Sequence, residues 1–200
     1  MGSIALVGHA RAGKDSIAQY LVTQHGYTRV AMADPIKDAL LVLNPLVATP
    51  DGAVRIADLV TERGWEGAKS ASPDIRRLMQ ALGTDVARTL FGDDVWIALA
   101  LRTVGPLLDA GLPVVISDVR FPNEASAFRR IGLRLVKVTR PGFALDTTHE
   151  SETSYSGIDC DAELINATTL DDLYRRADQI LTDHSHGGPA RGRRTGGRQR

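Results

Sequence analysis

Short apolar runs alternate along the chain with segments that have helical periodicity. The first run, SIALVG at 3–8, is continuous and ends in glycine, as expected for a strand buried in a parallel sheet. In the next segment, 14–26, apolar residues recur at helical spacing and stop at a glycine. Further strands are predicted at 27–33, 112–118, 133–140 and 162–166. Alternation of strands and helices predicts an α/β fold, in which helices cover both faces of a parallel five-stranded sheet.

The stretch between the second and third expected strands is less regular. Residues 44–52 are loop-like, 53–64 predict a short helix and 65–72 are loop-like again. Pro73 then opens a long amphipathic helix that ends at Gly92, and a further helix follows it. Residues 44–110 are therefore expected to form a mostly helical insertion. The two tryptophans, Trp65 and Trp96, are expected to pack in the core.

Composition places the chain among ordinary globular proteins, with 43% hydrophobic and 24% charged residues. Its length suits one domain, expected to span residues 1–183. No apolar run approaches the roughly 20 residues that a membrane helix needs, and the segment MGSIALVGHA lacks a basic leader. Cys160 is the only cysteine, so no internal disulfide can form. We therefore expect a cytoplasmic protein without a membrane partner.

The charge distribution is uneven at the C-terminus. The chain carries 24 basic and 24 acidic residues, yet residues 184–200, HSHGGPARGRRTGGRQR, contain five arginines and no acid. This tail has no apolar residue larger than alanine or proline, so it cannot bury a core and is expected to be disordered. A solvated extension is the preferred interpretation of the tail. Contact with nucleic acid is the alternative.

The segment GHARAGKDS nearly fits the phosphate-binding pattern G-x-x-x-x-G-K-[ST]. Gly8, Gly13 and Lys14 are in register, and the match lies between an expected strand and an expected helix, as the motif requires. In such a loop, backbone N–H groups surround a phosphate at the start of a helix. The lysine places a positive charge against the terminal phosphates of a nucleotide.

One position of this loop departs from the pattern. Asp15 stands where a hydroxyl is expected, and the hydroxyl of Ser16 comes one residue later. A carboxylate can reach Mg²⁺ through a water molecule, and a hydroxyl can bind the ion directly. Either residue is therefore a candidate for the metal.

A second candidate group ends the strand VVISDVR. Its apolar residues lead to Asp118, and Arg120 follows two positions later. Ligands of open α/β sheets bind at the carboxyl ends of the strands, so both side chains are expected beside the phosphate-binding loop. Arginine binds phosphate through two parallel hydrogen bonds, which makes Arg120 a candidate phosphate clamp.

Six segments together resemble the deoxynucleoside monophosphate kinases of bacteriophages: GHARAGKDS, ADPIKDAL, RRLMQALGTDVAR, DDVW, ISDVRFPNEA and HESE. They occur in the family's order from Gly8 to about Asn166, GKD followed by Ser or Thr is the family's own form of the loop, and DVRFPNE is the most specific piece. The resemblance implies a P-loop NTPase-like three-layer fold. It also implies transfer of the γ-phosphate of ATP to deoxynucleoside 5′-monophosphates, with broad base acceptance, for DNA precursor synthesis.

The resemblance further implies roles for single residues. ATP would be bound by Ala12, Gly13, Lys14, Asp15, Ser16 and Arg140. Asp15 and Ser16 would hold Mg²⁺. The deoxynucleoside monophosphate would be bound by Ile36, Lys37, Arg76, Arg120, Glu124 and Glu152. The expected catalytic residues are Lys14, Asp118 and Arg120.

Two alternatives stay open at this point. The segment from Glu163 to Leu181 is also similar to the end of dephospho-coenzyme A kinases. A protein of another class would bind nucleotide as a P-loop switch, or would bind nucleic acid through the arginine tail. The loop-rich residues 141–157 are a candidate lid. The resemblance leaves a homodimer and the base preference open.

Overall fold

The computed structural model describes residues 2–142 and 154–186, with side chains described up to residue 182. Five strands form the main sheet in the order β2-β5-β1-β6-β7: β1 (Ile4–Val7), β2 (Thr28–Val30), β5 (Val114–Val119), β6 (Arg134–Thr139) and β7 (Ala162–Ile165). Every neighbouring pair is parallel. The predicted parallel five-stranded sheet is therefore confirmed.

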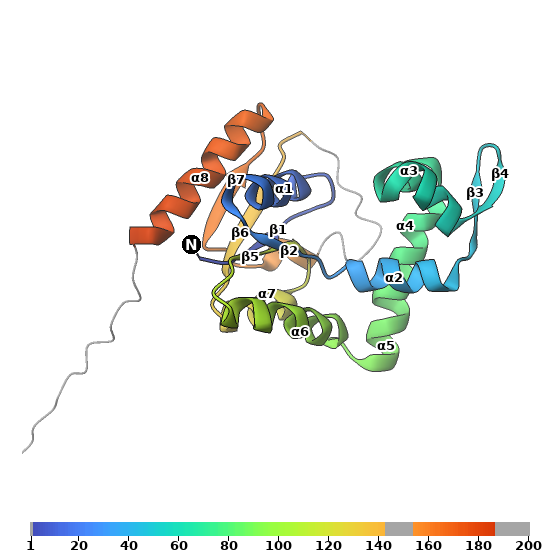
Figure 1. Cartoon of the computed structure of the whole chain (residues 1–200), viewed down its shortest axis with the longest axis horizontal. Coiled ribbons are helices and arrows are strands. Elements are labelled where there is room, and N and C mark those ends of the chain that lie inside the picture. The colour runs from blue at the N-terminus through green and yellow to red at the C-terminus, as the bar shows by residue number, and fades with distance from the viewer. Residues whose placement is uncertain (1, 143–153, 187–200) are drawn as a thin grey trace, which may run out of the picture.

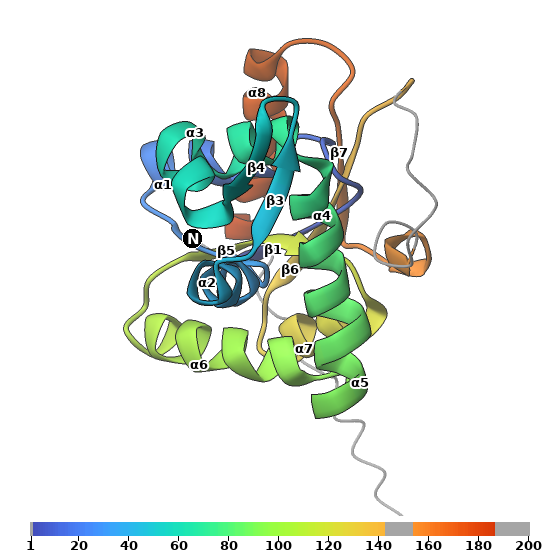
Figure 2. The same cartoon turned by 90° about the vertical axis from the view of Figure 1, so that its right-hand side faces the viewer.

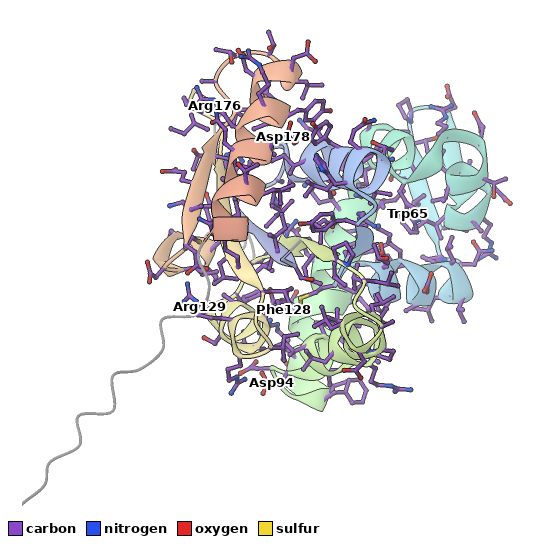
Figure 3. The ribbon with its side chains drawn as sticks, turned by 60° about the vertical axis from the view of Figure 1, so that its left-hand side comes forward. Trp65, Asp94, Phe128, Arg129, Arg176 and Asp178 are labelled. Atoms are coloured by element: carbon purple, nitrogen blue, oxygen red, sulfur yellow. The ribbon has the colours of Figure 1, made fainter. Side chains whose placement is uncertain are left out.

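Two pairs of helices cover the sheet, one pair on each face (Figure 1). They are α1 (Lys14–His25) with α8 (Leu170–His186), and α6 (Val95–Asp109) with α7 (Pro122–Arg130). Side chains alternate along a strand, so Leu6 packs toward α1 and α8 while Val7 packs toward α6 and α7. Phe128 of α7 is fully buried on the second face (Figure 3). The three layers agree with the predicted fold class.

The chain between β2 and β5 builds a second body beside the sheet (Figures 1 and 2). Its helices are α2 (Asp34–Leu43), α3 (Ile56–Ala71), α4 (Pro73–Gln80) and α5 (Ala87–Phe91). Helices α2, α3 and α4 share a separate core that includes Leu40, Ile56 and Ile75, with Trp65 packed against it. Helix α6 packs on the sheet instead. The packing thus groups α2 with this helical body and α6 with the sheet.

Two parts of the helical body contradict the loops expected there. Residues 44–55 contain an antiparallel hairpin of β3 (Leu46–Thr49) and β4 (Gly52–Arg55), closed by a two-residue turn. Residues 65–71 belong to α3, which continues past a non-helical Gly64. Both differences have one cause: these segments have weak local patterns and gain their stability by packing around buried Val47 and Ala68.

The C-terminal expectations are tested only in part. Helix α8 continues to His186, so the first residues of the expected tail are helical, while 187–200 lie outside the described residues. Most of the candidate lid, residues 143–153, also lies outside them. Within 2–142 and 154–186, no helix is long and apolar enough to cross a membrane.

Gly8 marks the closest approach of the loop after β1 to the neighbouring strand β6. A Cβ atom at Gly8 would lie 2.3 Å from the carbonyl oxygen of Val138, and its φ of 150° is one that side chains rarely adopt. We expect Gly8→Ala to lower the free energy of unfolding by about 3 kcal/mol, because backbone rather than a flexible side chain would have to move. Urea unfolding measures this loss.

Gly26 provides the matched control. It also has a positive φ, 67°, but nothing lies within 4 Å of an added Cβ. Gly26→Ala should therefore cost only the strain of a left-handed backbone, about 1 kcal/mol. Equal losses for the two variants would contradict the close approach at Gly8.

Candidate active site

The loop between β1 and α1 has the backbone geometry of a phosphate-binding loop. Gly8, Arg11 and Gly13 all have positive φ, and Gly13 precedes the first residue of α1 in a left-handed conformation. Helix α1 begins at Lys14, so the N–H groups of its first turn point toward the loop. A helix N-terminus of this kind attracts anions. The expected phosphate cradle is therefore formed in the folded chain.

Side chains hold this loop in shape. The amide Nδ2 of Asn166, just after β7, donates to the carbonyl oxygen of Ala12 at 2.9 Å. Lys14 Nζ donates to the carbonyl oxygens of Gly8 (2.7 Å) and His9 (2.6 Å). Ala12 is itself fully buried. Ala12 and Asn166 therefore shape the loop, and the lysine ammonium lies directly against it.

Two pockets open at the edge of the sheet where the strands end. We call the first the P-loop pocket, and it is strongly cationic. Its lining residues are Ala10, Arg11, Gly13, Lys14, Asp15, Ser16, Glu66, Lys69, Arg76, Ser117, Asp118, Arg120, Arg140, Asn166, Thr168 and Leu170. Six of these side chains are basic and three are carboxylates. A pocket of this charge is suited to a polyphosphate.

The second pocket, which we call the helical pocket, combines apolar side chains with polar and charged ones. Its lining residues are Met32, Ala33, Ile36, Lys69, Arg76, Met79, Gln80, Gly83, Thr84, Arg88, Trp96, Asp118, Arg120, Phe121 and Glu124. Its aromatic rings and methionine side chains suit the faces of a nucleobase, and its amide and hydroxyl groups suit the polar edge of the base. Four residues line both pockets: Lys69, Arg76, Asp118 and Arg120.

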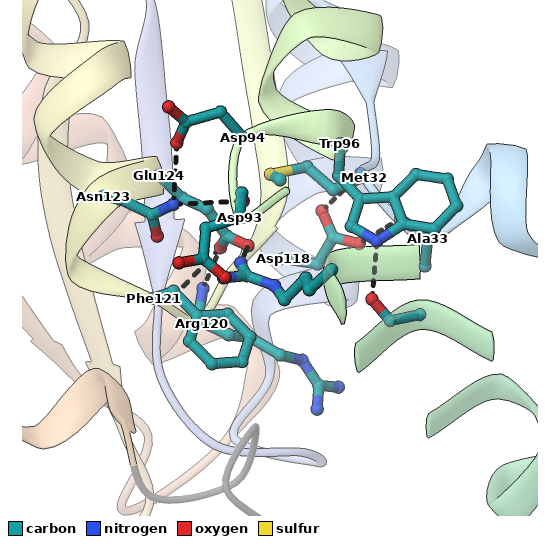
Figure 4. Close-up of polar contacts among 12 residues, drawn as sticks. Met32, Ala33, Asp93, Asp94, Trp96, Asp118, Arg120, Phe121, Asn123 and Glu124 are labelled. Atoms are coloured by element: carbon teal, nitrogen blue, oxygen red, sulfur yellow. Dashed lines mark hydrogen bonds and ion pairs between the residues drawn. The ribbon is translucent and has the colours of Figure 1, made fainter. Parts of the chain in front are cut away.

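A π-helical segment, Ala81–Val86, forms one wall of the helical pocket between α4 and α5. The carbonyl oxygen of Gly83 accepts a 2.6 Å hydrogen bond from Trp96 Nε1 (Figure 4). A Cβ atom at Gly83 would lie 2.7 Å from Ile36 Cδ1, so the missing side chain lets Ile36 reach this wall. Trp96 packs against the core of the sheet, as expected, and it also lines the helical pocket.

Asp118 joins the sheet to the helical body. Its Oδ1 accepts a hydrogen bond from the N–H of Met32 (2.8 Å), and its Oδ2 accepts one from Ala33 (2.9 Å), as Figure 4 shows. These two amides lie between β2 and α2. The carboxylate thus fixes the start of α2 at the junction of the two pockets.

Glu124 holds the loop that carries Arg120. One carboxylate oxygen accepts the N–H groups of Arg120 (2.8 Å) and Phe121 (3.0 Å), and the other accepts Arg88 Nη2 (2.8 Å). Burial raises the pKa of Glu124, against the amide hydrogen bonds and the charge of Arg88, which lower it. The guanidinium of Arg88 also lies 3.7 Å from the centre of the Phe121 ring. Arg88 comes from α5, so this network links the helical body to the end of β5.

The other predicted site residues fall in different places. Ile36 and Arg76 line the helical pocket, and Arg140 lines the P-loop pocket. Lys37 lines neither pocket and pairs with Asp34 Oδ1 at 2.6 Å. Glu152 lies outside the described residues.

Asp15 and Ser16 have the oxygen donors that Mg²⁺ prefers, and both line the P-loop pocket. The Asp15 side chain is 82% exposed, and its ion-pair distance to Arg29 Nη2 is 3.9 Å. A contact this long to an exposed carboxylate leaves Asp15 accessible to a metal or its water shell. The residues present therefore fit a magnesium ion.

Sequence reasoning missed three residues of the site. Lys69 falls in a segment expected to be a loop, Arg88 lies in the middle of an expected helix, and Asn166 ends a short strand. Only Asn166 had a usable signal, because it follows a predicted parallel strand at the carboxyl edge of the sheet. The other two come into the site through helix packing.

A phosphate-binding loop beside a second pocket built by inserted helices is the arrangement of a P-loop kinase. An unliganded sugar kinase from Janibacter sp. HTCC2649 has the same fold, with a TM-score of 0.52 and 12% identity over 91% of this chain and 95% of that one.

The chain belongs to the deoxynucleotide monophosphate kinase family, which it matches over residues 55–177. It is 30% identical over 182 residues to a protein of Acanthamoeba polyphaga mimivirus that is provisionally named a deoxynucleotide monophosphate kinase, covering 86% of this chain and 91% of that protein. It is 31% identical over 108 residues to the deoxynucleotide monophosphate kinase of Enterobacteria phage T4. That match covers 54% of this chain and 45% of the phage protein. The resemblance found in the sequence is thus confirmed.

The buried contact of Glu124 with Arg88 generates a stability prediction. Glu124→Gln should lower the free energy of unfolding by about 3 kcal/mol, because it leaves the largely buried Arg88 charge with only a 3.8 Å contact to the exposed carboxylate of Asp93. The double variant Arg88→Met with Glu124→Gln should recover part of this loss, since no unpaired charge remains. Chemical unfolding of both single variants and the double variant measures the coupling.

An exposed ion pair serves as the control for this cycle. Arg129 Nη2 lies 3.3 Å from Asp161 Oδ1, and the two side chains are 42% and 40% exposed. Arg129→Met should change stability by less than about 1 kcal/mol. Additive effects of the Arg88 and Glu124 changes would contradict the coupling.

Proposed function

We propose that the protein transfers the γ-phosphate of ATP to a deoxynucleoside 5′-monophosphate, giving the diphosphate and ADP. The observation that carries this proposal is the junction of the two pockets, where Lys69, Arg76 and Arg120 gather. A donor polyphosphate in the P-loop pocket and an acceptor phosphate from the helical pocket would meet at this junction. Membership of the deoxynucleotide monophosphate kinase family supports the choice of acceptor.

The residues divide into a donor group and an acceptor group. Lys14 and the N–H groups of the first turn of α1 bind the donor phosphates, with Arg140 on the same side. Arg76 and Arg120 hold the acceptor phosphate, and Trp96 and Ile36 contact its base. A bound Mg²⁺, held by Asp15 and Ser16, would neutralise charge on the donor phosphates.

Catalysis in this site consists of positioning and charge stabilisation. A 5′-phosphate is already ionised near neutral pH, so the acceptor oxygen needs no strong general base. The site instead has to hold donor and acceptor oxygens in line and stabilise the charge of the group in transit. Asp118 contributes by fixing the start of α2, through the amides of Met32 and Ala33.

The substrates are ATP and a deoxynucleoside monophosphate as small molecules. Acceptance of more than one base fits the small number of uncharged polar side chains in the helical pocket, Gln80 and Thr84. Dephospho-coenzyme A kinase activity and a nucleotide switch are less well supported, because the family match covers the segments that build the helical pocket. We further propose that the protein forms a homodimer and is located in the cytoplasm.

The central test is formation of ADP that depends on the acceptor. With ATP and Mg²⁺, a coupled assay should detect ADP on addition of dAMP, dGMP, dCMP or dTMP, and much less with ATP alone or with dephospho-coenzyme A. ADP formation independent of any deoxynucleotide would contradict the proposal.

Lys14→Met should lower kcat by about 100-fold or more, because Lys14 stabilises charge that develops on the phosphates.

Arg120 gives a test of the acceptor side. Arg120→Lys keeps the charge but loses the two parallel hydrogen bonds that a guanidinium makes to phosphate. We expect kcat/KM for the deoxynucleotide to fall at least about tenfold, which is about 1.4 kcal/mol, while KM for ATP changes less than about twofold. A kcat/KM close to that of the parent protein would instead assign Arg120 a surface role.

A further inference from the structure

Lys69 is a lysine of α3 that reaches the boundary of the two pockets from the helical body. It lines both the P-loop pocket and the helical pocket, as Arg76 and Arg120 do. Arg76 follows from the family resemblance and Arg120 from the strand end. Lys69 lies in a segment without a motif and has no assigned role.

The partner of Lys69 is a neighbouring carboxylate on the same helix. Lys69 Nζ lies 2.6 Å from Glu66 Oε1, and the two residues are three positions apart. The lysine side chain is 20% exposed, whereas that of Glu66 is 83% exposed. An ion pair with such an accessible partner contributes little to stability, so the lysine can exchange this partner at low cost.

Glu66 lies among several positive charges. Partial removal of its carboxylate from water acts to raise the pKa of Glu66, but the hydrogen bond from Lys69 and the charges of Lys69, Lys37 and Arg76 outweigh this and lower it. Glu66 also lines the P-loop pocket. An ionised carboxylate therefore occupies the cationic region in which the phosphates are proposed to meet.

We propose that Lys69 binds the phosphoryl group in transit, and that Glu66 holds its ammonium until both nucleotides are bound. No covalent bond changes in this exchange: an N–H···O contact to the carboxylate is replaced by one to a phosphate oxygen. The inference rests on the proposed phosphotransfer. It adds a charged group that the helical body supplies only when its pocket and the P-loop pocket are filled together.

A purely structural pair on a helix is also present for comparison. Arg77 pairs with Asp74 at the same spacing, with Nη2 2.9 Å from Oδ1, but the Arg77 side chain is 77% exposed and lines neither pocket. Arg77→Met therefore removes an equivalent helix pair without touching the site.

Steady-state kinetics of Lys69→Met, Lys69→Arg and Arg77→Met test the proposal. Loss of one transition-state cation should lower kcat about 30-fold or more in Lys69→Met. Lys69→Arg should restore at least part of the rate because it keeps the charge. Arg77→Met should stay within about twofold of the parent protein.

Binding of a pentaphosphate that joins adenosine and thymidine through their 5′ oxygens separates this role from a structural one. Such a ligand spans both pockets, so Lys69→Met should weaken it about tenfold or more while ATP alone binds nearly as before. Glu66→Gln should tighten the pentaphosphate. That gain should shrink in the Lys69→Met background, because the lysine would no longer be there to be released.

The outcomes distinguish the two levels of the proposal. If the parent protein forms no ADP that depends on a deoxynucleotide, the phosphotransfer itself is wrong. If the parent protein is active and Lys69→Met keeps kcat and pentaphosphate affinity within about twofold, the role of Lys69 is overturned while the function stands. Should Lys69→Met fail to fold, a Glu66→Gln variant that binds the pentaphosphate no more tightly than the parent protein would overturn it as well.

Discussion

All strands of the main sheet run in the same direction, and this constraint places every part of the site. Because the strands are parallel, their carboxyl ends meet at one edge. The loop after β1, Asp118 and Arg120 at the end of β5, Arg140 after β6 and Asn166 after β7 all lie there. Residues more than 150 positions apart, such as Ala12 and Asn166, come within hydrogen-bonding distance as a result.

The helical body is tied to this edge by two carboxylates. Asp118 accepts two amides at the start of α2, and Glu124 accepts two amides of its own loop together with the guanidinium of Arg88. Removing such groups from water is costly unless each oxygen finds a donor, and here all four oxygens do. The two pockets therefore keep a defined relation to one another, which a transfer between bound groups requires.

The features that the sequence predicted depend on local patterns, whereas those that it missed depend on packing between segments distant in the sequence. The strands and the phosphate-binding loop followed from continuous apolar runs and from glycines at fixed spacing, which are local features. The loops predicted at 44–52 and 65–72 were wrong, because packing rather than local pattern stabilises the hairpin around Val47 and the continuation of α3 to Ala71. Sequence analysis did not identify Lys69 and Arg88 as site residues for the same reason, since their place depends on how α3 and α5 pack against the rest of the chain.

The π-helical segment between α4 and α5 has a consequence for the alignment of side chains. In an α-helix each residue advances by about 100°, so residues four apart drift by roughly 40° and a row of them winds off one side. Gln80, Thr84 and Arg88 nevertheless all line the helical pocket. The wider turn at Ala81–Val86 winds more slowly and offsets this drift. The helix thereby presents an amide, a hydroxyl and a guanidinium in succession along one wall of the helical pocket.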